Sequence, residues 1–249
     1  MLQYFRYRVR RSLWKVDMKD VEFFKKYLDE QGDYEVLPEN EYENILRSTG
    51  ILEENRHKTI LDVGCGSGAF SIRLHRRGFT NITGMDLSSE LIAKAIQKNK
   101  NNEIRYQVGN ILKMPFNAGA FDIIFCGGVI HHLPKQIKEV SAEFGRVLKS
   151  GGKIYFFEPY SKCLNSLLRY RILSRNRTED ETALDPVKLR QILEGAGFMD
   201  FKWVKLKGVE CIYHMLDNGL TERIMGKSRK LVNEFILPNV YFAGSCVKK

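Results

Sequence analysis

A glycine-rich run follows a short apolar segment and carries an acid two positions ahead of its first glycine. The run Ile60–Gly68 reads ILDVGCGSG, with Asp62 preceding Gly64 and Gly66. A strand that breaks into glycines and then starts a helix lets a ligand approach the backbone amides at the helix N-terminus. Because the spacing to Ala69 also satisfies the dinucleotide-binding pattern, the loop alone predicts a nucleotide-like ligand and nothing narrower.

Two acids make this prediction more specific. A carboxylate at position 62 would not stabilise a bound pyrophosphate, whereas it would pair with the ammonium at the methionine end of S-adenosylmethionine. The alternative is that Asp62 only orders the loop through backbone bonds. Asp86 ends the next apolar run, at the edge of the predicted sheet beside the first loop, where it can accept from both hydroxyls of a ribose. The alternative there is a solvated acid at a strand end.

Histidines and cysteines supply the other reactive groups. His131 and His132 are adjacent, so one of them is expected to point away from any shared site, and the other could take a proton from a hydroxyl at neutral pH. Both could instead serve only packing or capping. Five histidines and five cysteines show no metal-ligand spacing and no C-x-x-C pair, which predicts no metal and no disulfide framework. Free thiols are typical of a reducing compartment, so we expect a cytoplasmic protein.

The elements that must position these residues alternate between short apolar runs and helical periodicity. This order is typical of an α/β protein with a doubly wound, mostly parallel sheet. The expected strands are 59–63, 82–85, 104–108, 121–125, 154–157, 201–206 and 241–247. Helices are expected over 68–77, over 91–98 after Ser88, between Pro134 and residue 148, and after Asp185-Pro186, with Gly151-Gly152 in a loop.

Several stretches lie outside this repeat. Residues 1–57 are predicted to form an N-terminal helical arm or cap. Residues 58–249 are predicted to form the main domain, with substrate-side insertions at about 160–184 and 208–238. The basic first sixteen residues also fit an organellar presequence, although their aromatics favour an arm packed on the domain. The net charge of +10 hints at an anionic partner. No apolar run approaches the roughly 20 residues of a membrane span.

Residues 58–160 resemble the catalytic core of class I S-adenosylmethionine-dependent methyltransferases, in the subgroup of the ubiquinone and menaquinone enzymes. The resemblance rests on Ile60–Gly68, on GMDLS at 84–88, on VGN at 108–110, on FDIIF through HHL at 121–133, and on RVLKSGG at 146–152. It implies a Rossmann-like sheet of seven strands, the last antiparallel, with the cofactor over the carboxyl ends of the first, second and fourth strands.

The resemblance also implies roles for individual residues. Its cofactor-binding positions are Asp62, Gly64, Cys65, Gly66, Asp86, Leu87, Asn110, Ile111 and Cys126, and it places His131 and His132 near the transferred methyl. Asn110 stands where the family usually has an acid that accepts the adenine amino group; an amide oxygen can still accept that bond, so we expect weaker recognition.

The sequence therefore predicts transfer of a methyl group from S-adenosylmethionine to a small-molecule acceptor by in-line displacement. The product of the cofactor would be S-adenosylhomocysteine. Two other classes stay open: an RNA or protein methyltransferase that uses the basic surface, and an oxidoreductase or non-catalytic protein that binds a nucleotide cofactor. Nucleic acid is thus a possible partner but not the favoured one. Acceptor identity and oligomeric state are not encoded in these motifs.

Overall fold

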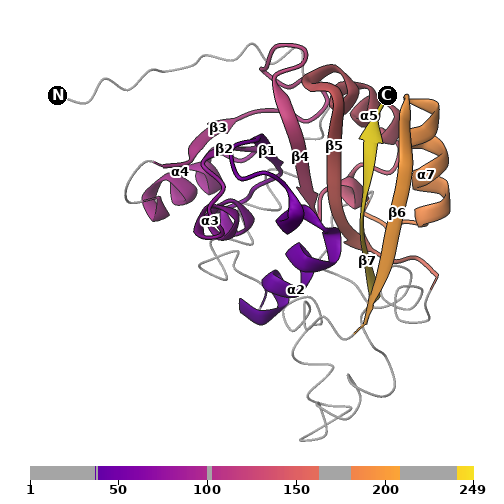
Figure 1. Cartoon of the computed structure of the whole chain (residues 1–249), viewed down its shortest axis with the longest axis horizontal. Coiled ribbons are helices and arrows are strands. Elements are labelled where there is room, and N and C mark those ends of the chain that lie inside the picture. Colours follow the sequence, from indigo (N-terminus) through magenta and orange to yellow (C-terminus); the bar gives the residue numbers. More distant parts are fainter. Residues whose placement is uncertain (1–36, 38, 100–102, 163–180, 208–239) are drawn as a thin grey trace, which may run out of the picture.

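The computed structural model describes residues 37, 39–99, 103–162, 181–207 and 240–249. Seven strands form one sheet in the order β3-β2-β1-β4-β5-β7-β6 (Figure 1). The strands are β1 (Thr59–Val63), β2 (Asn81–Asp86), β3 (Arg105–Val108), β4 (Phe121–Gly127), β5 (Leu148–Pro159), β6 (Phe198–Lys207) and β7 (Val240–Lys248). Neighbours among β1 to β5 pair in parallel, whereas β7 runs antiparallel to both β5 and β6. The predicted doubly wound, Rossmann-like sheet with an antiparallel last strand is confirmed.

Helices follow the strands in the predicted order. The principal ones are α2 (Glu39–Thr49), α3 (Ala69–Arg76), α4 (Ser89–Lys98), α5 (Ile137–Val147) and α7 (Pro186–Gly195). Ser88 accepts a hydrogen bond from the Leu91 amide, which confirms the predicted N-cap, and Asp185 caps the helix that begins at Pro186 by accepting from the Val187 amide. No helix in the described ranges is long and apolar enough to cross a membrane.

The core has two halves because consecutive strand residues face opposite sides of the sheet. Ile124 and Cys126 of β4 pack on the side covered by α5 and α7. Ile123 and Phe125 of the same strand pack on the opposite side, where α2 and α3 contribute Leu46 and Leu74 to one apolar cluster. Nearly continuous apolar strands with both faces buried leave the strand ends as the place for polar groups.

Three elements begin at least three residues away from the predicted start, and other boundaries shift by one or two residues. Strand β6 begins at Phe198, before the predicted residue 201. Residues 151 and 152, expected in a loop, lie within β5, because Leu148 already pairs with Phe121 across a register shift. Helix α5 begins at Ile137 and not at Pro134, which lies in the turn before it. The first sixteen residues, most of the predicted arm, and most of both insertions lie outside the described residues.

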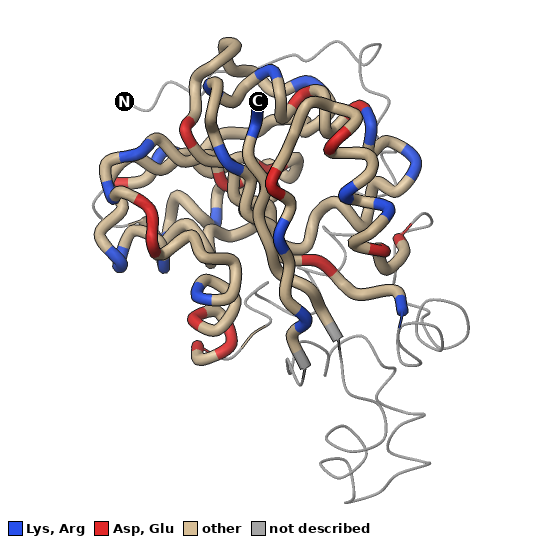
Figure 2. Tube along the Cα trace, turned by 45° about the vertical axis from the view of Figure 1, so that its right-hand side comes forward, with Lys and Arg blue, Asp and Glu red and all other residues tan. Residues whose placement is uncertain are grey.

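The basic surface expected from the net charge is tested only in part. Three groups of Lys and Arg in the sequence, in the first sixteen residues, at 169–177 and at 227–230, lie outside the described residues. On the described chain, Lys and Arg are interspersed with Asp and Glu along the trace (Figure 2). The described part of the molecule therefore adds no support for a nucleic-acid partner.

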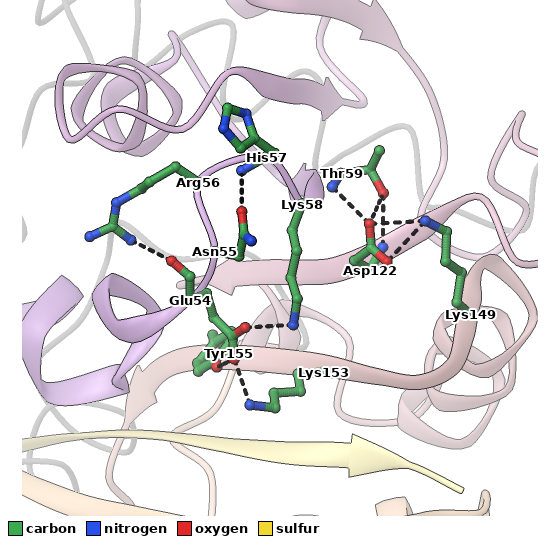
Figure 3. A network of polar contacts seen from close by, with 10 residues as sticks. All are labelled: Glu54, Asn55, Arg56, His57, Lys58, Thr59, Asp122, Lys149, Lys153 and Tyr155. Carbon is green, nitrogen blue, oxygen red and sulfur yellow. Dashed lines mark hydrogen bonds and ion pairs between the residues drawn. The ribbon is translucent and has the colours of Figure 1, made fainter.

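A network of ion pairs ties the amino ends of the strands together (Figure 3). Glu54 accepts hydrogen bonds from Lys58 (2.6 Å), Lys153 (2.5 Å) and the Tyr155 hydroxyl (2.5 Å). Asp122 of β4 accepts from the backbone and hydroxyl of Thr59 at 2.9 and 2.7 Å, and pairs with Lys149 of β5 at 2.9 Å. These contacts join the segment before β1 to strands β4 and β5. They lie at the end of the sheet opposite the glycine-rich turn of residues 64–68.

Candidate functional site

The glycine turn between β1 and α3 lies at the carboxyl end of the sheet. The amides of Gly64 and Cys65 both donate to the Met85 carbonyl, at 2.8 and 3.1 Å, which joins the turn to β2. Gly64 has a φ of 66° and Gly66 a φ of 55°, a region that favours glycine. A Cβ on Gly64 would lie 2.2 Å from Val129 in the turn after β4, whereas one on Gly66 would meet nothing within 4 Å. Gly64 thus permits close packing, and Gly66 faces open space.

Asp86 ends β2 beside this turn, where the predicted sheet placed it. One carboxylate oxygen accepts from the Gly66 amide and the other from the Ser88 amide, both at 2.9 Å. Burial raises the pKa of Asp86 above its ordinary value of 3.8, against the opposing effect of these backbone bonds. The Leu87 amide adds to this opposing effect, and a carboxylate with about four acceptor positions retains at least one for a further hydrogen bond.

Asp62 is buried beneath the glycine turn. Its side chain is 1% exposed and accepts a 2.5 Å hydrogen bond from the hydroxyl of Ser71 on α3. Burial raises the pKa of Asp62 from 3.8 to about 7. The Ser71 bond agrees with the alternative in which Asp62 orders the loop, so a contact with the ligand ammonium stays a prediction.

The remaining predicted cofactor positions have different degrees of burial. Leu87 is partly exposed, whereas Cys65 and Ile111 are 7% and 8% exposed. The amide oxygen of Asn110 accepts from the Leu112 backbone at 2.8 Å, so this side chain already orders its own loop. Cys126 is fully buried. Their roles in binding stay predictions.

A second polar cluster follows β4, in the 3₁₀ turn η3 (Ile130–His132). Glu158 near the end of β5 is fully buried and accepts from the amides of Val129 and Ile130 at 3.0 and 2.8 Å. Its other oxygen lies 2.8 Å from Nδ1 of His131. Because a carboxylate needs a donor, His131 carries its proton on Nδ1 and directs the lone pair of Nε2 elsewhere.

Both histidines turn toward the same acid, which corrects the expectation that one of them would point away. Oε1 of Glu181 lies 3.8 Å from Nε2 of His131, and Oε2 lies 3.7 Å from Nδ1 of His132. The two imidazole rings are also in contact, with centroids 4.0 Å apart and planes tilted by 39°. The tight turn places the two rings against each other. The nearby carboxylates are Glu158 from β5 and Glu181 from the segment before α7. Burial and the neighbouring His131 lower the pKa of His132 well below 6.5.

The two clusters meet through the turn after β4. Val63 of β1 pairs with Cys126 of β4, and the close approach of Gly64 to Val129 brings the glycine turn against the histidine turn. The structure therefore brings the glycine turn and the two histidines to one end of the sheet.

Three residues of this region carried little or no signal in the sequence. These residues, Glu158, Ser71 and Glu181, are not among the site residues that the sequence predicts. A serine on the apolar face of a short helix was a usable signal for Ser71, because such a hydroxyl needs a buried partner. Glu181 follows a polar stretch without periodicity, and nothing in its neighbourhood distinguished it.

Comparison with known proteins agrees with this arrangement. Residues 61–156 match the model of the family described as "Methyltransferase domain". The ubiquinone biosynthesis O-methyltransferase of Coxiella burnetii is 30% identical over 65% of this chain and 70% of its own length. The demethylmenaquinone methyltransferase of Chlorobaculum tepidum is 33% identical over 50% of this chain, and the match spans only 57% of that relative.

A solved structure shows the same fold. The phospholethanolamine N-methyltransferase 2 of Haemonchus contortus, in complex with phosphomonomethylethanolamine and S-adenosylhomocysteine, superposes with a TM-score of 0.63 at 19% identity. That match covers 92% of this chain and 57% of the other. Taken with the sequence matches and the strand order, this shows that the chain belongs to the class I S-adenosylmethionine-dependent methyltransferases.

Proposed function

We propose that this protein transfers the methyl group of S-adenosylmethionine to a hydroxyl group of a small-molecule acceptor by in-line displacement. The observation that carries the proposal is the meeting of two clusters at one end of the sheet. Carboxylates surround the glycine turn, and imidazoles lie in the adjacent turn after β4. The named activities of the two relatives support a small acceptor, and the O-methyltransferase supports an oxygen.

The residues of the glycine turn fit the cofactor. Asp86 retains acceptor capacity beyond its backbone hydrogen bonds, which suits a ribose hydroxyl. The open side of Gly66 leaves room for the ligand to lie against the backbone. Asp62 and Asp86 form no ion pair with Lys or Arg in the described chain, so the positive charge of the methionine end would be favoured here.

The histidine turn fits the acceptor. Nε2 of His131 holds a lone pair, because Glu158 retains the proton on Nδ1. In the proposed step the acceptor oxygen attacks the methyl carbon, the carbon–sulfur bond breaks, and the sulfonium becomes a neutral thioether. The hydroxyl proton passes to the imidazole. Alignment in a dry site supplies most of the acceleration, and proton removal raises the nucleophilicity of the oxygen.

A direct test combines binding with a screen for the acceptor. Calorimetry should give micromolar affinity for S-adenosylmethionine and S-adenosylhomocysteine, about −7 to −8 kcal/mol. The protein is then mixed with a library of hydroxylated metabolites, and S-adenosylhomocysteine release is measured. Release with a small hydroxylated compound, slowed in the Asp86→Asn variant when the cofactor is below saturation, supports the proposal.

Other outcomes would contradict it. Binding of the cofactor without release for any small compound, but with release for RNA or a protein, would assign the macromolecular alternative. Absence of cofactor binding would remove the methyl-transfer proposal itself. Release only with amines or thiols would retain methyl transfer and overturn the hydroxyl acceptor.

A further inference from the structure

Three side chains converge near the turn after β4. One ligand atom from each of His131, His132 and Glu181 lies within 4.8 Å of the other two. The imidazole nitrogens lie 3.7 and 3.8 Å from the nearest Glu181 oxygens, which is too long for a hydrogen bond. Glu181 and His131 are buried, and His132 is partly buried.

Two imidazoles and one carboxylate are a common ligand set for catalytic metal ions. Zinc hydrolases use two histidines and a glutamate, and non-heme iron sites use the same three donors on one face of the metal. Donors bound at about 2.0 to 2.1 Å around a tetrahedral ion are about 3.3 Å apart. Side-chain rotations that move the donor atoms by about an ångström would therefore close the cluster around one ion.

A second observation comes from Glu158 on the other side of His131. Metal-bound histidines usually donate their remaining ring N–H to a carboxylate, which fixes the tautomer and orients the ring. The Glu158 oxygen lies 2.8 Å from Nδ1 of His131, and the amides of Val129 and Ile130 hold that carboxylate in place. The Nε2 lone pair of His131 is thereby aimed toward Glu181, as a metal ligand requires.

We propose that His131, His132 and Glu181 form a binding site for one divalent transition-metal ion of the zinc type. Glu158 would orient the His131 ring through its hydrogen bond to Nδ1. Imidazole donors favour such ions over Mg²⁺ or Ca²⁺, which prefer oxygen ligands. Three protein ligands leave a position open for an oxygen of the acceptor. A metal ion there would lower the pKa of a bound hydroxyl, in place of an imidazole acting as the base. The site itself does not depend on methyl transfer.

Metal binding is tested first without any measurement of activity. The full chain is stripped with a chelator and titrated with Zn²⁺ and, separately, Mg²⁺ by calorimetry, and with Co²⁺ followed by visible absorption. We expect one Zn²⁺ per chain, much weaker Mg²⁺ binding, and a Co²⁺ spectrum of nitrogen and oxygen ligands without a thiolate charge-transfer band. Zn²⁺ should also raise the melting temperature.

Variants locate the ion. Removing a group that hydrogen-bonds to a metal ligand typically lowers metal affinity by about 10 to 100-fold, which is the effect expected for Glu158→Gln. His132→Ala and Glu181→Gln each remove a ligand, so each should lower Zn²⁺ affinity by at least about 100-fold, more than Glu158→Gln does. His57→Ala is the matched control, since this exposed histidine lies at the opposite end of the sheet (Figure 3) and its removal should leave Zn²⁺ affinity unchanged. Circular dichroism of each metal-free variant establishes that it is folded.

The outcomes separate this inference from the proposed function. Unchanged Zn²⁺ affinity in a folded Glu181→Gln/His132→Ala double variant, equal affinities for Mg²⁺ and Zn²⁺, or a thiolate band with Co²⁺ would each overturn the metal site. S-adenosylhomocysteine binding is measured on the same samples. Zn²⁺ binding without cofactor binding would uphold the metal site and contradict the proposed function, and the reverse result would do the opposite.

Discussion

The carboxylates at the two ends of the sheet have pKa values shifted in opposite directions. At the amino end, Glu54 accepts from Lys153, Lys58 and Tyr155, and Asp122 accepts from Thr59 and Lys149. These bonds outweigh the effect of burial and lower the pKa of each acid to about 2. At the carboxyl end, Asp62 and Asp86 receive hydrogen bonds only from neutral donors, and burial raises both pKa values. The cost of removing a carboxylate from water is therefore outweighed at one end, where lysines contribute, and only partly offset at the other.

This difference separates stability from function along one sheet. At the amino end, the carboxylates of Glu54 and Asp122 pair with lysines of the described chain, and these ion pairs hold three segments together (Figure 3). The carboxyl end has acids that a cationic ligand would stabilise, which is where a sulfonium cofactor is proposed to bind. Substitutions at the carboxyl end should therefore change catalysis and binding, and those at the amino end should change folding stability.

The largest expected effect is on turnover at the histidine turn. His131→Asn retains an N–H donor for Glu158 but removes Nε2, so kcat with the identified acceptor should fall by about 10² to 10⁴-fold, the usual contribution of a general base. Affinity for S-adenosylhomocysteine should stay near that of the wild type. Steady-state kinetics and calorimetry measure the two quantities. Full turnover in both His131→Asn and His132→Ala would show that the histidines are structural.

The next effect is on cofactor affinity at the end of β2. Asp86→Asn keeps the size of the side chain but weakens its bonds to the ribose, and hydrogen bonds to charged groups are worth about 1.5 to 3 kcal/mol. Calorimetry should show a loss of roughly 2 kcal/mol, equivalent to about 30-fold. Asp122→Asn, the matched change at the amino end, should bind the cofactor normally. Equal affinity in both variants would remove the ribose assignment.

A smaller effect concerns pH and Asp62. If the ionised form pairs with the ligand ammonium, a pKa of about 7 predicts that affinity for S-adenosylhomocysteine rises about tenfold between pH 6 and pH 8. Asp62→Asn should make this profile flat. A steep profile in the variant would assign the titration to another group.

The same raised pKa predicts the pH dependence of stability without ligand. The protonated carboxyl of Asp62 contributes folding stability that is fully present below pH 3.8, the ordinary pKa of an aspartate. This stability is lost as the pH rises through about 7. Urea unfolding should therefore show Asp62→Asn gaining stability relative to the wild type between pH 6 and pH 8. A constant difference over that range would contradict the assignment.

The smallest effect is on stability at the amino end. Glu54→Gln should lower the free energy of unfolding at pH 7 by about 1 kcal/mol, because the lysine partners are partly exposed. A lowered pKa means that this contribution is present above pH 4.5 and is lost as the pH falls toward about 2. Urea unfolding at pH 7 and pH 3 measures the difference, and turnover per folded molecule should not change. A loss of cofactor affinity in this variant would contradict the separation of the two ends.

The sequence predicted every strand of the sheet and the place of Asp86. Local signals sufficed there, because apolar runs define buried strands, glycines mark the turn, and a parallel sheet brings the ends of β1 and β2 to one edge. The start of β5 was missed, because its first residues pair with β4 only through a register shift, which no local pattern reveals.

Partners that come from distant segments could be decided only by the tertiary structure. The motif at residues 60–68 already identified the glycine turn, but the bond from Ser71 to Asp62 depends on how α3 packs against β1. The histidine pair was visible as two letters, yet its environment required β5 and the segment before α7 to deliver Glu158 and Glu181. Local sequence fixes which groups stand at a strand end, whereas the burial and electrostatics that set their chemistry arise when chain-distant side chains pack together.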